Sequence, residues 1–517
     1  DDVLGNEDED EDEDEDEKDN NDDNRNKKKR KDEGEVLLNS KEMLKALKIM
    51  ERVTVLNGNN ESYYNFRYYK DSDYKRGSFV SKLWTFKYKG NERNVTCLEW
   101  NKLHLDLFAV GYGSYNFNFQ TSGMICIYSL KSTVYPEKII LCESGVMSMS
   151  FHPKYSSLLC VGNYDGSVAV YDIRNRDDSP IYSSQNPESH HSDPVWDIKW
   201  YQMDELQHEL MFYSISSDSE IKFWKLSQNE LNYQVLIKLT TPPITITQSM
   251  EPITNNNNND DLEEEENNRD EKALCSCFDF NPAMEHLYLV GTEDGHILEC
   301  NKTYSDGYTK IYINAHYMNI YCIKWNPFHN KIFLSCSEDW TIKLWEINNE
   351  ITKSDKKDNK LQFDTEPIIT YDLGNSINDI SWSPYSSTVF AAVTSDGKVH
   401  VFDLAQNKNA PLCSEQITNK KSSIKLTKVA FPIGFPLIIV GDENGNVYAL
   451  KLSPNLYLDK VKHRDILKNV SPEMFNNQDF KEKEKDKLIN VLNVTGNKVF
   501  DIIQHFSPQK KPKKMKQ

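Results

Sequence analysis

The strongest constraint on the fold of this chain is a pattern that recurs seven times between residues 97 and 452. Each unit combines an apolar strand ending in an aromatic residue, a turn, a second apolar strand, a tight turn led by Asp or Asn, and an alternating strand. The clearest units are SMSFHPKYSSLLCVGNYDGSVAVYDI (148–173), CIKWNPFHNKIFLSCSEDWTIKLWEI (322–347) and DISWSPYSSTVFAAVTSDGKVHVFDL (379–404). One such unit cannot bury its apolar face alone, so the units are predicted to pack against one another.

The spacing of the units indicates the architecture. The aromatic residue that ends the first strand recurs every 45 to 57 residues, apart from one interval of 80. These residues are Trp100, Phe151, Trp200, Phe280, Trp325, Trp382 and Phe431. The long interval contains a low-complexity insert at 241–272, and without its 32 residues the interval is 48. A period of about 40–50 residues with four short strands per unit is typical of a β-propeller, so we predict an all-β, seven-bladed propeller.

Turn and edge chemistry agree with this prediction. Asp165-Gly166, Asp294-Gly295, Asp396-Gly397 and Asn444-Gly445 are suited to two-residue hairpin turns, which need a positive φ. Asp218-Ser219 and Asp339-Trp340 are less regular members of the same set. A closed ring leaves few free strand edges. We expect an N-terminal strand at 83–88 to complete the last blade.

The segments that flank the repeats differ from them in composition. Residues 1–35 hold 19 acidic and 7 basic side chains, so we predict a disordered acidic tail that acts as a solvated spacer or attaches to a basic surface. The chain begins with Asp, which suggests a processed chain or a fragment. The other predicted parts are a helix at 36–56, an aromatic-rich lead-in with the closing strand at 57–93, the propeller at 94–452, and a helical, charged extension with a basic tail at 453–517.

The predicted N-terminal helix is amphipathic. Asn39 and Glu42 have the spacing of a capping box, and Lys41, Lys45 and Lys48 occupy the side opposite the apolar face. The apolar residues at helical spacing include Met43, Leu44, Leu47 and Met50. A short helix of this kind packs either on its own domain or in the groove of a partner.

Composition excludes several classes of protein. The net charge is −19, of which residues 1–35 contribute −12, so the body lacks the basic surface of a nucleic-acid-binding domain. No stretch approaches the roughly 18 consecutive apolar residues of a transmembrane helix, and no membrane partner is expected. Most of the ten cysteines lie in apolar runs, as buried thiols of a cytosolic protein do.

Motifs of enzyme chemistry are absent from the sequence. There is no GxxxxGK[ST] phosphate loop, no HExxH and no GxSxG. Cys275 and Cys277 form a CxC pair, which we expect to share one face of a strand, and no second Cys/His pair lies at zinc spacing. We therefore predict a chain that is not an enzyme and that holds no cofactor or metal.

Two sets of residues resemble hydrolase triads by composition alone. They are His191, Ser214, Asp218 and Trp224 in one unit and His316, Ser335, Asp339 and Trp345 in another. Both sets recur in register with the repeat and end in its Trp. Since geometry rather than composition defines a triad, we interpret them as structural hydrogen-bond relays that tie the loop before a blade to its inner turn and outer strand.

The segment between Gly111 and Gly123 is a polar and aromatic loop candidate. It contains Tyr112, Tyr115, Phe117 and Phe119. Aromatic residues in loops are plausible interface anchors. The alternative is that they cover their own blade.

Several blocks of this sequence resemble a known family. LFAVGYGSYNF (107–117), GMICIYSLK (123–131), HSDPVWDIKW (191–200), KIFLSCSEDWTIKLWE (331–346) and SSTVFAAVTSDGKVHVFDL (386–404) are similar to the WD-repeat region of axonemal dynein intermediate chains, in particular the outer-arm intermediate chain 1 type. The resemblance covers about 44–456.

The resemblance implies a non-catalytic scaffold subunit of a microtubule motor in the ciliary or flagellar axoneme, assembled in the cytoplasm. Its expected partners are the dynein heavy-chain tail, a second intermediate chain and light chains. The helix at 36–56 is similar in position to the helix that binds light chains of the roadblock class, so Met43, Leu44, Leu47 and Met50 are candidate contacts. The alternative is a general WD-repeat adaptor of another complex, such as a ubiquitin ligase.

Overall fold

The computed structural model describes most of the chain between residues 38 and 506. The described range lacks residues 39, 70–72, 74–75, 89, 91–92, 176, 185, 202–209, 228–229, 242–270, 285, 303–306, 348–365, 419–423 and 458–477, and it gives no side chains for residues 271 and 493–506. The predicted acidic tail, nearly all of the low-complexity insert and the basic end at 507–517 lie outside it. The chain forms two compact units, Asp1–Tyr63 and Tyr64–Gln517, which are described separately.

The first unit contains helix α2 (Lys41–Gly58), and helix α3 (Asn60–Arg67) follows it into the second unit. The N-cap of α2 differs from the predicted one. The predicted cap residue, Asn39, lies outside the described residues. Ser40 is the N-cap, and its hydroxyl accepts a hydrogen bond of 3.2 Å from the backbone N–H of Met43. Helix α3 lies within the predicted aromatic-rich lead-in at 57–93, for which no helix was predicted.

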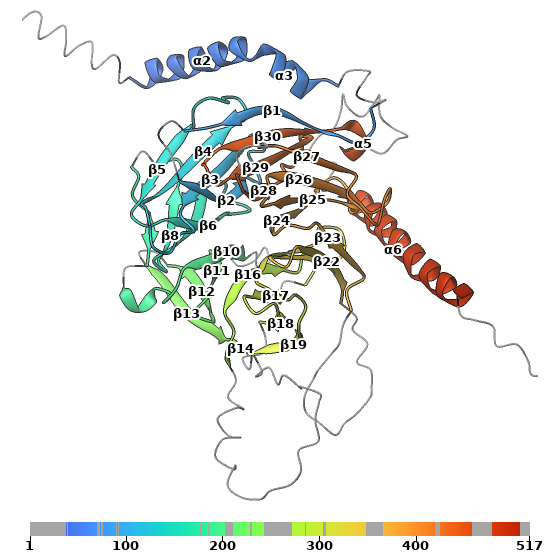
Figure 1. The fold of residues 1–517 in the computed structure, drawn as a ribbon. Helices are drawn as coiled ribbons and strands as arrows, with labels where there is room; N and C mark the ends of the chain where they lie inside the picture. Colours follow the sequence, from blue (N-terminus) through green and yellow to red (C-terminus); the bar gives the residue numbers. More distant parts are fainter. Residues whose placement is uncertain are drawn as a thin grey trace, which may run out of the picture. The chain divides into compact units, whose positions relative to one another are not determined.

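The second unit consists mainly of seven four-stranded antiparallel sheets, numbered here as blades 1 to 7 (Figure 1). Blades 1 to 3 are built from β2 (Asn94–Trp100), β3 (Leu107–Gly113), β4 (Gly123–Ser129) and β5 (Lys138–Cys142); β6 (Val146–Phe151), β7 (Leu158–Asn163), β8 (Val168–Asp172) and β9 (Tyr182–Ser183); and β10 (Val195–Tyr201), β11 (Met211–Ser216), β12 (Glu220–Leu226) and β13 (Leu231–Lys238).

Blades 4 to 7 repeat this order from the innermost strand outward. They are built from β16 (Cys275–Phe280), β17 (Leu287–Thr292), β18 (Ile297–Asn301) and β19 (Tyr308–Tyr312); β20 (Ile320–Trp325), β21 (Ile332–Ser337), β22 (Thr341–Glu346) and β23 (Ile369–Asp372); β24 (Ile377–Trp382), β25 (Val389–Thr394), β26 (Lys398–Asp403) and β27 (Cys413–Gln416); and β28 (Leu426–Ala430), β29 (Leu437–Asp442), β30 (Val447–Leu452) and β1 (Val80–Phe86). The short strands β14 (Thr240–Thr241) and β15 (Glu271–Lys272) pair between blades 3 and 4.

The blades close into a ring. Each innermost strand contacts the next, and β28 of blade 7 contacts β2 of blade 1. The N-terminal strand β1 supplies the outermost strand of blade 7 by pairing antiparallel with β30, from Val80 opposite Leu452 to Phe86 opposite Val447. The predicted seven-bladed all-β propeller is therefore confirmed. Because the strand that precedes blade 1 in the sequence pairs with the third strand of blade 7, hydrogen bonds join the first and last strands of the ring.

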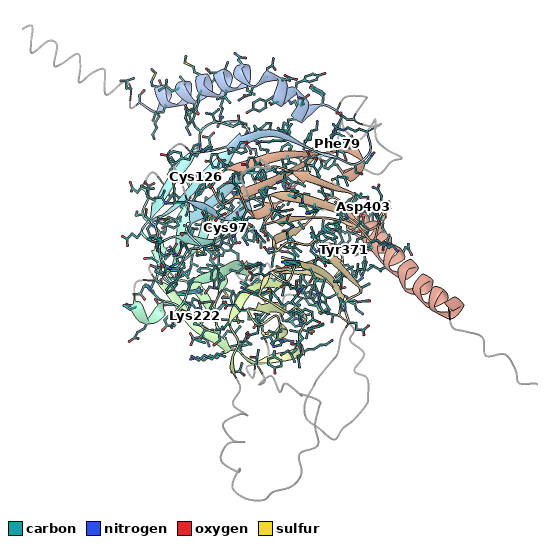
Figure 2. The ribbon with its side chains drawn as sticks, in the orientation of Figure 1. Phe79, Cys97, Cys126, Lys222, Tyr371 and Asp403 are labelled. Carbon is teal, nitrogen blue, oxygen red and sulfur yellow. The ribbon has the colours of Figure 1, made fainter. Side chains whose placement is uncertain are left out.

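Every innermost strand carries a β-bulge near its start, between equivalent residues such as Val95 and Cys97 in blade 1. The bulge interrupts the alternation of side chains. In blade 4 it lies between Cys275 and Cys277, which pack in two different hydrophobic clusters. The prediction that these two cysteines share one face is therefore wrong. All ten cysteines are free thiols, and nine are buried. Figure 2 marks Cys97 and Cys126 in blade 1.

Neighbouring blades are joined by hydrogen bonds that recur at the same place in the repeat. In three blades the residue that ends the innermost strand is a Trp whose indole N–H donates to a carbonyl of the preceding blade: Trp200 to Ser150 at 2.9 Å, Trp325 to Asp279 at 3.2 Å and Trp382 to Lys324 at 3.1 Å. The residue after the aromatic reaches the following blade when it is Asn. The bonds run from the Nδ2 of Asn101 to Ser156 O (2.8 Å), Asn281 to Asn330 O (2.7 Å) and Asn326 to Ser387 O (2.9 Å).

The tight turns between the second and third strands share one backbone conformation. In blades 2, 4, 6 and 7 the turn places a glycine at positive φ, for example Gly166 at 80°. In blades 3 and 5 the same position holds Ser219 at 67° and Trp340 at 70°. A residue other than glycine in this region stores roughly 1–3 kcal/mol of strain. The ring therefore tolerates a costly bulky residue at one turn, that of Trp340.

The two faces of the propeller differ. Because strands alternate in direction, the tight turns and the loops that enter each blade lie on one face, here called the turn face. The other loops lie on the opposite face, where the C-terminal extension packs. Helix α6 (Gln478–Phe506) buries Leu488 in a cluster with Trp382, and Phe480 contacts Phe328. The short helix α5 (Pro454–Tyr457) packs Tyr457 on Tyr385. This opposite face is here called the α6 face.

Candidate functional site

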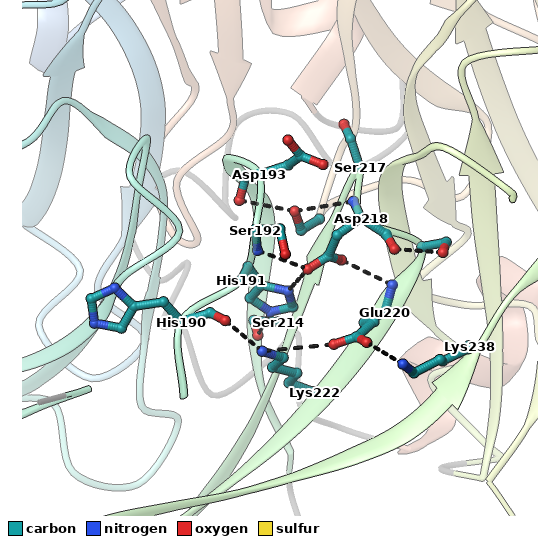
Figure 3. Close-up of polar contacts among 12 residues, drawn as sticks. His190, His191, Ser192, Asp193, Ser214, Ser217, Asp218, Glu220, Lys222 and Lys238 are labelled. Carbon is teal, nitrogen blue, oxygen red and sulfur yellow. Dashed lines mark hydrogen bonds and ion pairs between the residues drawn. The ribbon is translucent and has the colours of Figure 1, made fainter. Parts of the chain in front are cut away.

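The first predicted relay lies in blade 3 (Figure 3). His191 enters from the loop before β10, Ser214 lies on β11, Asp218 leads the tight turn, and Trp224 lies on β12. The His191 Nε2 is 2.7 Å from Ser214 Oγ, and its Nδ1 is 2.8 Å from Asp218 Oδ2. The Trp224 indole N–H donates to Ser214 Oγ at 2.7 Å. The chain of bonds ends on the third strand of the blade, not on its outermost strand.

The second predicted relay has the same geometry in blade 5. His316 Nε2 lies 2.7 Å from Ser335 Oγ, its Nδ1 lies 3.0 Å from Asp339 Oδ2, and the Trp345 indole N–H donates to Ser335 Oγ at 2.9 Å. Thr341 Oγ1 also donates to Asp339 at 2.6 Å. Every polar atom along the path has a partner, so the network can stabilise the blade rather than penalise it.

The protonation states follow from burial and from these bonds. Burial lowers the pKa of His316, which is therefore neutral at pH 7 and can donate from Nδ1 while it accepts from Ser335 at Nε2. Burial alone would raise the pKa of Asp339, but the hydrogen bonds from His316 and Thr341 outweigh it and lower that pKa. The pKa of Asp218 is lowered in the same way by His191.

The relays lack the features of a nucleophilic site. The side chains of Ser214 and Ser335 are fully buried, so no substrate carbonyl can approach either hydroxyl. Each hydroxyl also accepts from a Trp N–H that is part of the blade core. Two lysines, Lys222 and Lys343, each lie two residues before the Trp of a relay. They donate to carbonyls of the same entering loops, His190 O at 2.7 Å and Ala315 O at 2.5 Å. The arrangement fixes loops on the turn face.

The axis of the ring holds a cavity of about 830 Å³ lined by charged residues of the innermost strands. Lys199 pairs with Asp279 at 2.6 Å and with Asp197 at 3.6 Å. Burial disfavours the charged form of Lys428, but Asp379 and other neighbours outweigh it and raise its pKa. Acidic and basic side chains alternate around the wall, so the cavity does not favour a ligand of one charge. These residues were not predicted from the sequence.

The aromatic residues of the predicted interface loop separate into two groups. Tyr112 lies on β3, is fully buried and has its hydroxyl 3.5 Å from that of Tyr128, so its assignment to an exposed loop is wrong. Strand β3 continues through Tyr112 to Gly113, whereas the prediction started the loop after Gly111. Tyr115 donates its hydroxyl to Thr96 O at 3.2 Å at the mouth of the axial cavity. Phe117 and Phe119 are 83% and 74% exposed.

The residues predicted for light-chain binding are all exposed on α2. Met43, Leu44, Leu47 and Met50 expose between 39% and 64% of their surface. The helix carries a second apolar stripe, at Ile49, Val53 and Leu56, which are also exposed. The prediction of a single apolar face is therefore incomplete, since α2 presents apolar side chains on two sides.

Two further properties of the described residues concern membranes and metal ions. No helix in that part of the chain is long and apolar enough to cross a membrane. Within the same residues, no group of three or more His, Cys, Asp and Glu side chains could hold a metal ion.

The fold defines the class of the chain as a seven-bladed WD-repeat propeller. The WD domain, G-beta repeat family matches residues 307–346 and 366–403, which cover blade 5 and most of blade 6. The blade 5 relay, its Trp345 and the turn at Trp340 lie within residues 307–346.

Comparison with curated proteins shows which WD-repeat proteins this chain is similar to. The chain is 40% identical over 80% of its length to dynein intermediate chain 2, ciliary, of Heliocidaris crassispina, and it covers 55% of that protein. It is 41% identical over 81% of its length to the flagellar outer-arm dynein 78 kDa intermediate chain of Chlamydomonas reinhardtii, of which it covers 58%. With dynein axonemal intermediate chain 1 of Bos taurus the identity is 37% over 80% of the chain and 55% of the relative.

Over about four-fifths of its length the chain is thus similar to axonemal dynein intermediate chains, and two of its repeats match the WD-repeat family model. It spans just over half the length of the curated relatives that it matches. By their names these relatives are ciliary or flagellar proteins, in agreement with the predicted axonemal localisation. The sequence-based resemblance to this family is confirmed.

Proposed function

We propose that this chain is a non-catalytic scaffold subunit of an outer dynein arm, whose propeller binds the heavy-chain tail and a second intermediate chain, and whose α2 helix binds a light chain of the roadblock class. The observation that carries the proposal is the closed ring of blades in a chain that is similar to dynein intermediate chains. In blades 3 and 5 the His, Ser and Asp side chains of the relays are hydrogen-bonded to one another within the blade. Such a ring is suited to rigid support of partners.

The amphipathic helix supports the light-chain part of the proposal. Eight large apolar residues between Leu38 and Leu56 expose at least 39% of their surface, and Val55 is the buried residue of α2. A helix that presents apolar side chains on two sides gains most when a groove encloses it. Burying such side chains contributes roughly 25 cal/mol per Å² of apolar surface, so a grooved partner would stabilise the helix considerably.

The complex itself is tested by purification of the full-length tagged chain from salt-extracted axonemes, with the co-purifying proteins identified by mass spectrometry. We expect axonemal dynein heavy chains, a second intermediate chain and light chains. Recovery of ubiquitin-ligase components without heavy chain would replace the proposal with the general adaptor function.

The light-chain contact is tested in the same purification with Leu44→Asp/Leu47→Asp. Both side chains are 44% exposed, so the substitutions should leave the propeller intact while they remove the apolar surface. We expect the light chain to fall at least about tenfold with heavy chain unchanged, since each lost apolar anchor costs roughly 1–2 kcal/mol. Lys45→Ala, on the side of the helix between the two stripes, is the control. Full retention of the light chain in the double variant would refute the assignment of α2.

A further inference from the structure

One exposed aromatic patch lies on the turn face beside the blade 5 relay. It consists of Tyr317, Met318 and Trp340, which are 87%, 50% and 53% exposed, and it is called the blade 5 patch below. Tyr317 and Met318 follow the relay residue His316, and Trp340 follows Asp339. The relay holds them together, because the backbone N–H of Tyr317 donates to Asp339 Oδ2 at 3.1 Å.

The position of Trp340 is unusual for its side chain. Four of the equivalent turns place glycine at positive φ, whereas Trp340 adopts φ 70°. Burial of the side chain does not compensate for this strain, since Trp340 is 53% exposed. A strained backbone that presents a large exposed aromatic residue is the kind of feature found where a partner binds.

The rim of the blade 5 patch is acidic. The turn at Glu293 and Asp294 lies against the Tyr317–Met318 loop, because a Cβ added to the next residue, Gly295, would lie 3.1 Å from Met318 O. On the other side, the backbone N–H of Glu338 donates to Asn319 O at 3.1 Å. Asp294 is exposed, and Glu293 and Glu338 are partly exposed.

A basic group beside the patch, Lys343, is already engaged. Lys343 lies 5.8 Å from the Tyr317 ring and donates to the carbonyl of Ala315 at 2.5 Å. The exposed charge of the patch is therefore negative. An acidic rim repels the phosphates of nucleic acids and of anionic lipid surfaces.

We propose that the blade 5 patch is a docking site for a polypeptide segment of a partner subunit that carries both large apolar and basic side chains. The apolar side chains would cover Tyr317, Met318 and Trp340, and Lys or Arg would face Glu293, Asp294 and Glu338. The site lies on the turn face, away from the α6 face that the chain's own C-terminal helix covers at blades 5 and 6. This inference deepens the proposed function, on which it rests, by naming a face and the chemistry that it recognises.

The test places a photo-reactive benzoylphenylalanine at position 340 of the full chain, assembled in its native complex. A matched control carries the same group at Tyr155, which is 50% exposed in the loop between β6 and β7, on the α6 face. We expect position 340, and not position 155, to cross-link to a partner peptide that is net positive and contains large apolar residues. The proposal is overturned by no cross-link, by a cross-link to an acidic peptide, or by a cross-link to the chain's own residues 507–517.

Substitution by glycine separates binding from folding. Trp340→Gly removes the indole and the strain of the positive φ, so we expect an unchanged or slightly raised melting temperature. We also expect the partner protein identified by cross-linking to co-purify at least tenfold less with this variant after a salt wash. Ser219→Gly, at the equivalent turn of blade 3, should relieve strain without loss of that partner. Equal retention in Trp340→Gly and wild type would overturn the proposal.

The outcomes for the two proposals are distinct. Co-purification with dynein heavy chains without a cross-link from position 340 would refute the patch and leave the proposed function standing. A basic, apolar peptide cross-linked from a protein outside dynein would support the patch and refute the proposed function. Failure of both co-purification and cross-linking would refute both.

Discussion

The carboxylate of Glu484 in α6 accepts a hydrogen bond of 2.9 Å from the backbone N–H of Ser387, in the loop between β24 and β25. The Ser387 hydroxyl donates to the same carboxylate at 3.1 Å and to the backbone carbonyl of Glu484 at 2.7 Å. Glu484 is 7% exposed and Ser387 fully buried. The Ser-Ser-Thr run that carries part of the family resemblance is thus the socket for the C-terminal helix.

This socket predicts the effect of Glu484→Ala. The substitution leaves the buried N–H of Ser387 without its acceptor, whereas the Ser387 hydroxyl keeps the backbone carbonyl of residue 484, so the attachment of α6 should weaken by about 1–3 kcal/mol. Hydrogen exchange of residues 478–492 measures the attachment, and we expect it to accelerate strongly while the blades stay protected. Glu482→Ala, at an exposed position of the same helix, is the control. Unchanged exchange over 478–492 would contradict the role of Glu484.

Trp345→Ala should destabilise blade 5. The side chain is 2% exposed, stacks on Phe333 at 6.2 Å between ring centroids and donates to Ser335. Removing a large buried aromatic residue costs roughly 3–5 kcal/mol, which a lower melting temperature would report. Tyr155→Ala, with a half-exposed ring, is expected to change the melting temperature far less. Equal melting temperatures for Trp345→Ala and wild type would contradict the buried position of the indole.

His152 makes part of the stability dependent on pH. Its Nδ1 accepts from the backbone N–H groups of Lys154 and Tyr155, and burial lowers the pKa of this histidine to about 4. The unfolded chain binds the proton below its ordinary pKa of about 6.5. The contribution is therefore complete above that pH and is lost as the pH falls toward 4.

His152→Asn tests this dependence with a residue that the repeat uses at the same place. Asn101 accepts the two equivalent N–H bonds in blade 1 and does not titrate. Between pH 7 and pH 4 the wild type should lose about 1–2 kcal/mol more stability than the variant, after allowance for solvent screening. Urea unfolding at several pH values measures the difference. Parallel pH profiles of the two proteins would show that His152 does not supply it.

Gly166→Ala should be more harmful than the same change at Gly374. Both glycines have positive φ, at 80° and 71°. A Cβ at Gly166 would lie 2.0 Å from the carbonyl oxygen of His191, whereas at Gly374 it would meet open space. Strain alone costs about 1–2 kcal/mol, and the clash adds to it only at Gly166. Chemical denaturation compares the two variants, and equal losses would refute the close approach of blade 2 to the relay loop of blade 3.

The fold was predictable because the repeat is a local property. Strand length, the aromatic residue at the end of each first strand and the Asp-led turn are visible within each unit, and their period indicates the ring. The relay residues were also predictable by type, since His191 and His316 recur in register. The placement of Tyr112 failed because nothing local marks the end of an apolar strand, and the bulge at Cys275 failed because a bulge depends on pairing with β17.

The sequence by itself thus determined the class of fold, the number of blades, the resemblance to a family and the positions where relays form, because each rests on a pattern within about 50 residues of chain. Only the tertiary structure decided which residues meet across the ring. Glu484 finds Ser387, the turn at Asp294 borders Met318, and Trp340 stays exposed on a strained turn. These relationships join segments whose separation in sequence carries no periodic signal, so packing alone brings them together.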